Sequence, residues 1–233
     1  MSTLNEITYD LLSVLRDGGL NIKDDEGVTL RQIAFWVRGA RASLIRQQLS
    51  KRQSISDNIV QTLSCLDVSQ IDASTCCDFT TDCYIVRTNS RIPQVIESNQ
   101  VDLITKVGPM HVSERGYTLI PYARAPFWGS SMFNKDRPAA FLHDGYVYIM
   151  NSDFIDKISV QGVFEDPTEL ATFNNCDSVP CYTKDSRYPV SAHMIDTMKK
   201  MIIDTNFRVM LQANVDKTNN AESSVTPQAV NGQ

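Results

Sequence analysis

Apolar residues recur at helical spacing in three parts of the chain. Residues 4–16 place a single apolar stripe along a helix. Thr29, followed three residues later by Gln32, is a capping-box arrangement, which predicts a second and longer helix that ends near Ser50. A third main helix is predicted over residues 189–212, where Pro occupies the first position. The early and late parts of the chain are therefore expected to be helical.

Between these helices the period changes to short runs that are typical of β-strands. The runs cover residues 59–68, 84–88, 94–97, 103–107, 117–121, 141–149 and 155–164. Asp144 and Gly145 predict a tight hairpin turn, because these residue types supply the positive φ angles that such a turn requires. Asp166 and Pro167 then match the start of a helix, so a short helix to about Phe173 should follow.

This order of elements predicts an α+β fold in which N-terminal helices and a C-terminal helix pack with a small antiparallel β-domain. The predicted parts are an N-terminal helical hairpin (1–56), an antiparallel β-domain (57–166), C-terminal helices that complete the helical part (167–212) and a polar C-terminal arm (213–233). The arm contains no aromatic residue, Leu, Ile or Met, so burial cannot offset its ordering entropy. We expect it to extend and grip a neighbouring molecule.

The helix over residues 30–50 also carries the most informative surface. Arginines gather on the side opposite its apolar arc, and two apolar residues, Phe35 and Ile45, lie among them. A solvated face is one interpretation of such a charge run. Exposed apolar side chains among arginines favour the other interpretation, a surface that contacts another chain.

The end of the C-terminal helix is apolar nearly all round, which a free surface helix cannot be, so it too should have a partner. The predicted interface residues on the two helices are Arg31, Phe35, Arg38, Arg41, Ile45 and Arg46, together with Ile203, Phe207, Met210 and Leu211.

Composition narrows the class of protein. The net charge of −5 argues against bulk wrapping of nucleic acid, and the sequence has neither an apolar run long enough to span a membrane nor a leader-like start. We therefore expect a soluble protein that assembles in the cytosol. The six cysteines should then be reduced and mostly buried, with Cys65 on a strand.

The sequence contains no motif that predicts catalysis or a cofactor. The glycines form neither a dinucleotide-binding fingerprint nor a phosphate-binding loop, and no nucleophile elbow is present. The adjacent carboxylates Glu165 and Asp166 lie where a helix start needs a cap rather than an acid and a base. One alternative stays open: Cys176, Cys181 and His193 could form the metal site of a small cytosolic binding module.

Five stretches of the sequence resemble structural proteins of crAss-like bacteriophages. They are TLRQIAFWVRGARASLIRQQL, LIPYARAPFWG, FLHDGYVYI, VQGVFEDPTELATF and YPVSAHMIDTMKKMII, and the resemblance extends over residues 4–212. Each stretch is unspecific alone, whereas their order along one chain is distinctive.

The resemblance implies a virion protein, a ring subunit of the head-to-tail connector. Such a subunit would form a twelve-fold ring of identical copies below the portal and extend the DNA channel toward the tail. Its partners would be the portal protein and adjacent ring or tail proteins, and the helix over residues 189–212 with the following arm would dock on the portal. The arginines could instead line the channel and touch genomic DNA, but Phe35 and Ile45 favour a protein partner.

Overall fold

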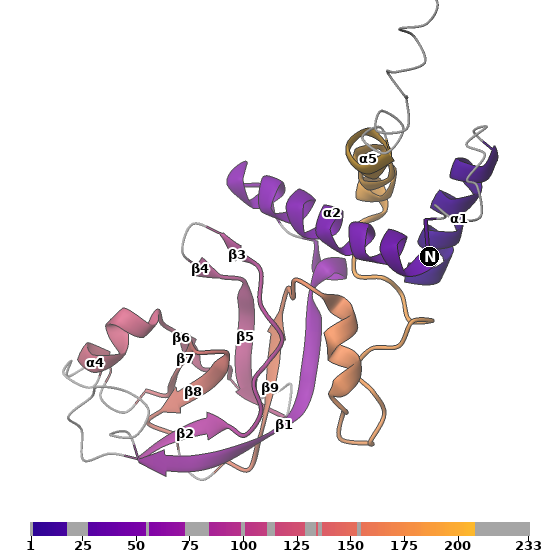
Figure 1. Cartoon of the computed structure of the whole chain (residues 1–233). Coiled ribbons are helices and arrows are strands. Elements are labelled where there is room, and N and C mark those ends of the chain that lie inside the picture. The colour runs from indigo at the N-terminus through magenta and orange to yellow at the C-terminus, as the bar shows by residue number, and fades with distance from the viewer. Residues whose placement is uncertain are drawn as a thin grey trace, which may run out of the picture.

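Helices α1, α2 and α5 gather at one end of a curved β-sheet (Figure 1). The computed structural model describes residues 2–17, 28–54, 56–72, 84–98, 101–110, 115–128, 134, 137–152 and 155–207. The helices are α1 (Leu4–Asp17), α2 (Leu30–Ser50), α4 (Ala125–Trp128) and α5 (Ala192–Ile202), with shorter helical turns η1 (Asp57–Ile59), η2 (Tyr122–Arg124), η3 (Pro167–Thr172) and η4 (Ile203–Phe207). The strands are β1 (Gln61–Asp72), β2 (Tyr84–Thr88), β3 (Glu97–Ser98), β4 (Val101–Asp102), β5 (Ile104–Pro109), β6 (Thr118–Leu119), β7 (Ala139–His143), β8 (Tyr146–Met150) and β9 (Lys157–Gly162).

Capping fixes where the first two helices begin. Thr3 and Glu6 satisfy each other's backbone N–H groups at the start of α1, and Thr29 Oγ1 accepts a hydrogen bond from the Gln32 N–H at 3.2 Å at the start of α2. The predicted extents of both helices are confirmed. Helix α2 crosses the end of the sheet and packs against both α1 and α5, so it is covered on more than one side (Figure 1).

The strands form one seven-stranded sheet in the order β5-β9-β1-β2-β8-β7-β6, and β3 and β4 form a separate hairpin. The α+β class is confirmed. Contrary to the sequence prediction, the β-domain is not entirely antiparallel, because β6 pairs with β7 in parallel. That pairing follows from the long connection between the two strands, which carries η2 and α4 and returns the chain in the same direction.

The two edges of the seven-stranded sheet come together. The N–H of Tyr117, just before β6, donates to the carbonyl oxygen of Val107 in β5 at 2.7 Å. Gly108 makes this approach possible, since a Cβ there would lie 3.0 Å from the Cα of Gly116. The sheet therefore curls into a partly closed barrel.

The β7–β8 hairpin has the predicted turn. His143 pairs with Tyr146, which leaves Asp144 and Gly145 as the two turn residues, with φ angles of 50° and 78°. Both central residues thus occupy the left-handed region that this type of hairpin requires.

The cysteine prediction is wrong in one respect. Cys65 lies on β1 as expected, but it forms a disulfide with Cys176, 111 residues later in the chain, with a Cα–Cα distance of 5.2 Å. The pairing of β1 with β9 shifts register between Leu63 and Leu66, and Cys65 lies in this irregularity with a φ of 57°. The strand thus turns Cys65 toward the loop that carries Cys176.

Several predicted features differ in extent or lie outside the described residues. Helix α5 begins at Ala192, after rather than at Pro189, and continues as a π-helical turn to Phe207. The expected helical residues 208–212 and the arm over residues 213–233 lie outside the described part of the chain. The division of the chain into four parts stays a prediction.

Candidate interface on the helical end

Arg41 is not exposed, contrary to the sequence prediction, and has no accessible surface. Its Nε donates to the carbonyl oxygen of Pro189 at 2.7 Å, and its Nη1 donates to that of Phe164 at 2.7 Å. Burial lowers the pKa of Arg41, against the opposing influence of Tyr188 and Tyr182. Its role within the chain is structural, since it joins α2 to the end of the sheet and to the segment before α5.

Ile45 is also fully buried, so the expectation that it projects from the arginine face is wrong. The sequence prediction assumed that α2 buries only its apolar arc, whereas the sheet covers the helix on one side and α1 and α5 cover it on others. Arg41 and Ile45, four residues apart, lie on the side that the sheet end covers.

Two more arginines contact acids of the same chain. Arg38 forms an ion pair with Asp166, and Arg46 forms one with Glu165 at 2.7 Å. Asp166 also accepts a hydrogen bond from the N–H of Thr168 at 2.8 Å, so its predicted capping role is confirmed. The pKa of Glu169, close to these ion pairs, is raised mainly by burial and secondly by the charge of Asp166.

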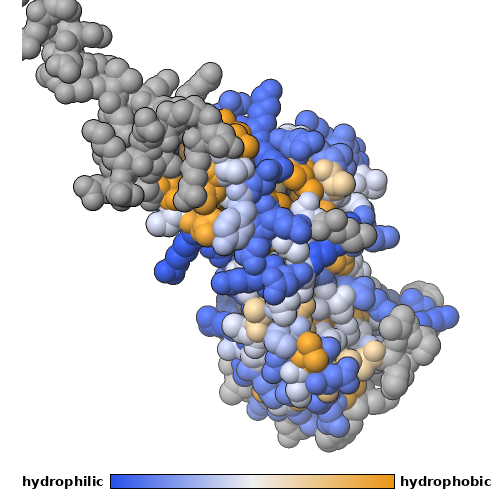
Figure 2. All heavy atoms as spheres, turned by 90° about the vertical axis from the view of Figure 1, so that its right-hand side faces the viewer, coloured by the Kyte–Doolittle hydropathy of each residue, from blue (hydrophilic) through white to orange (hydrophobic). Residues whose placement is uncertain are grey.

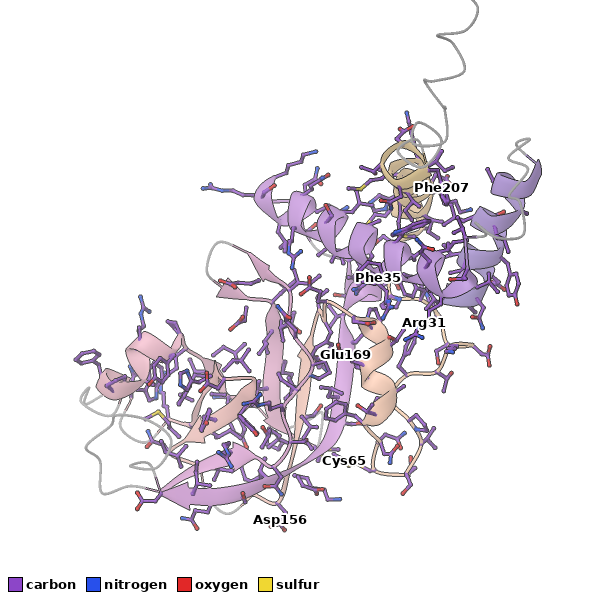
Figure 3. The ribbon with its side chains drawn as sticks, viewed as in Figure 1. Arg31, Phe35, Cys65, Asp156, Glu169 and Phe207 are labelled. Carbon is purple, nitrogen blue, oxygen red and sulfur yellow. A yellow bond between two sulfur atoms is a disulfide. The ribbon has the colours of Figure 1, made fainter. Side chains whose placement is uncertain are left out.

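Of the predicted interface residues on α2, Arg46 is exposed but paired with Glu165, whereas Arg31 and Phe35 are exposed in the N-terminal half of the helix. We call Leu30, Arg31 and Phe35 the α2 ridge. Phe35 is 65% exposed, and Arg31 is exposed with no ion pair in the described part of the chain. Figure 3 shows Arg31 and Phe35 along this half of the helix, and Figure 2 shows orange patches among blue over the helical end.

Two grooves flank the α2 ridge. One, of about 260 Å³, lies between α2 and the end of α5, and its lining includes Phe35, Trp36 and Met201. The other, of about 450 Å³, lies toward α1 and is lined in part by Tyr9 and Arg31. An exposed aromatic residue beside an unpaired arginine is the composition that protein interfaces favour.

The end of the C-terminal helix finds part of its partner within the chain. Phe207 is buried, and its ring meets Trp36 of α2 edge to face at 5.0 Å. Ile203 is half-buried. The sequence pattern showed that this end needs cover but not that α2 supplies it. Met210 and Leu211, the other predicted contacts, lie outside the described residues.

A second surface, which the sequence did not indicate, lies where β5 and β6 approach each other. A pocket of about 340 Å³ opens there, and we call it the β5–β6 pocket. Apolar residues including Ile104, Leu119 and Phe141 line it, and Asp102 stands among the lining residues. Glu97 is the cross-strand partner of Asp102, so two carboxylates face each other. Partial burial and the charge of Glu97 raise the pKa of Asp102.

The described residues give no support to a metal site. They contain no group of three or more His, Cys, Asp or Glu side chains that could hold an ion. Of the three residues suggested as metal ligands, Cys176 forms the disulfide with Cys65, and Cys181 is a free thiol. The third, His193, has its Nε2 atom 3.2 Å from Nε2 of Gln48. None of the described helices is both long and apolar enough to cross a membrane.

Comparison with known protein families shows to which family the chain belongs. The model of the family CrAss_Ring_2, described as phage tail ring protein 2, matches residues 6–228. The chain belongs to this family. The crAss-like resemblance is thereby confirmed, and family membership makes the chain a structural protein of the phage virion that assembles with other virion proteins. No curated protein matches the chain. For a ring protein, the exposed α2 ridge is a candidate contact surface.

Proposed function

We propose that this ring protein is a subunit of the head-to-tail connector, where it attaches to the portal and extends the DNA channel toward the tail. The family match over residues 6–228 carries the proposal. Its role there is structural, without catalysis, and the copies close into a ring that the resemblance gives as twelve-fold.

A closed ring of identical subunits requires a heterologous interface, in which one face of each copy meets a different face of the next. Two unlike surfaces of this chain fit that requirement. The α2 ridge is apolar and cationic, and the β5–β6 pocket is apolar and acidic.

The burial pattern also supports protein partners over DNA. Arg38 and Arg46 are neutralised by Asp166 and Glu165, and Arg41 is inside the chain. Of the four arginines in the predicted interface, Arg31 is the one that these contacts leave free. Sequence-blind binding to phosphates would use several exposed cations together, so the DNA-lining alternative has less support.

In this proposal, the helix over residues 189–212 and the arm that follows it attach to the portal. Deletion of residues 213–233 should leave the fold intact, because the described core ends before them. The truncated chain should lose stable attachment to the portal or the neighbouring ring, measured by co-sedimentation with purified portal. Normal attachment by a folded truncated chain would contradict this part of the proposal.

A further inference from the structure

We propose that the α2 ridge of one copy docks at the β5–β6 pocket of the next copy, with Phe35 entering the pocket and Arg31 facing Asp102. The inference rests on the proposed function, since it names the surfaces through which neighbouring ring subunits meet. Its occupant is a second copy of this chain.

The apolar parts of the two surfaces are complementary. Phe35 is a large aromatic side chain that is 65% exposed. Exposure of its ring to water is unfavourable, and a partner that covered the ring would remove this contact with water. The β5–β6 pocket offers about 340 Å³ between apolar walls, and Leu119 at its lining is 38% exposed. An aromatic anchor in an apolar pocket is the usual centre of a protein interface.

The charges are complementary as well. Asp102 and Glu97 stand opposite each other across the β3–β4 hairpin, an arrangement that is unfavourable for two like charges. Within the described residues neither carboxylate forms an ion pair, and Arg31 forms none either. A cation placed beside Asp102 would relieve this repulsion.

On each surface the charged and apolar groups lie close together. Arg31 and Phe35 are four residues apart on α2 and so are neighbours on one face of the helix. Asp102 and the apolar walls belong to the same pocket. One turn of helix can therefore present the aromatic ring to the pocket and the guanidinium to the carboxylate.

The two surfaces are formed by different parts of the molecule. In Figure 1 the N-terminal half of α2 lies on the right, whereas β6 lies to the left of β5 and the β3–β4 hairpin lies at the upper end of β5. Figure 3 places Arg31 and Phe35 on that right-hand side. A contact between them joins copies head to tail, which is the arrangement that closes a ring.

A charge exchange between copies tests the contact. Arg31→Glu and Asp102→Arg are made separately in the full chain, and multimers are measured by native mass spectrometry, with purified portal where the wild-type chain requires it. Each variant alone should fail to form rings. A one-to-one mixture should form them again, because every interface in an alternating ring then pairs opposite charges.

Lys51→Glu and Asp156→Arg are matched controls, with the same charge changes at exposed positions outside the two surfaces. Both should assemble like the wild-type chain, and all variants should melt like it. Phe35→Ala should raise the concentration needed for assembly by about tenfold or more.

Normal rings from either single charge variant would overturn the inference, as would a mixture that fails to restore them. Variants that form rings but no longer attach to portal or tail would also overturn it, because the ridge would then contact another virion protein. A wild-type chain that forms no multimer with or without portal would instead contradict the proposed function itself.

Discussion

The guanidinium of Arg41 donates a hydrogen bond to the backbone oxygen of Pro189 at 2.7 Å, across 148 residues of sequence. A second bond, to Phe164, ties the same side chain to the end of the sheet. Arg41 thus joins α2, the end of the sheet and the segment before α5. Because the side chain is buried and both bonds go to backbone carbonyl oxygens, its contribution is structural.

Replacement of Arg41 by Ala should destabilise the chain by about 3 kcal/mol, because it leaves a cavity and two buried carbonyl oxygens without donors. Arg46→Ala, which breaks only an exposed ion pair, should cost less than about 1 kcal/mol. Urea unfolding followed by circular dichroism measures both. Equal stability losses in the two variants would contradict the assigned role of Arg41.

Alkaline pH should destabilise the fold through two buried tyrosines. Burial raises the pKa of Tyr182 to about 12 and shifts the pKa of Tyr188 further in the same direction. Since the unfolded phenols ionise near pH 10, the folded state binds their protons more tightly. Their contribution is fully present below about pH 10 and is lost as the pH rises toward 12.

Neither phenol has a hydrogen-bond partner for its hydroxyl among the described residues. The double variant Tyr182→Phe and Tyr188→Phe should therefore keep or gain stability at pH 8 and should lose less than the wild-type chain at pH 11. Parallel losses in the two proteins, measured by urea unfolding at both pH values, would argue against burial of the ionising groups.

The bond between Cys65 and Cys176 should stabilise the chain by about 2–4 kcal/mol, since it closes a long loop. Dithiothreitol should lower the melting temperature of the wild-type chain and leave that of Cys65→Ser unchanged. Alkylation of the native chain followed by mass spectrometry should label Cys181 and spare the bonded pair. Labelling of Cys65 and Cys176 in the unreduced protein would contradict the pairing.

Met198→Asp should unfold the protein, because the side chain is fully buried and an aspartate there would lack a partner. Lys200→Asp, on the exposed side of the same helix, is the control and should stay folded. Circular dichroism and solubility report the outcome. A soluble, folded Met198→Asp variant would show that the inward side of α5 has been assigned incorrectly.

Capping and turn residues, which act on neighbours in the sequence, correctly predicted where some of the helices and turns begin. Thr29 and Gln32 placed the start of α2, and Asp144 with Gly145 placed the hairpin turn, because each depends on residues adjacent in sequence. The exposure of Phe35 was likewise predictable from its place outside the apolar arc.

The errors arise from contacts distant in sequence. The pattern of apolar residues along α2 could not show that the sheet covers Arg41 and Ile45, since their burial depends on how α2 crosses the sheet end. The partners of Cys65 and Phe207 are far away and carry no local signature. The β5–β6 pocket exists only because two strand edges meet in the folded chain.

Cryo-electron microscopy of the neck of the intact virion would show whether this chain forms a ring in the head-to-tail connector. We expect density for a closed ring of identical copies adjoining the portal, around the DNA channel, into which the α2, α5 and sheet arrangement of this chain fits. A neck region whose density contains no such ring, or a virion that lacks this chain, would contradict it.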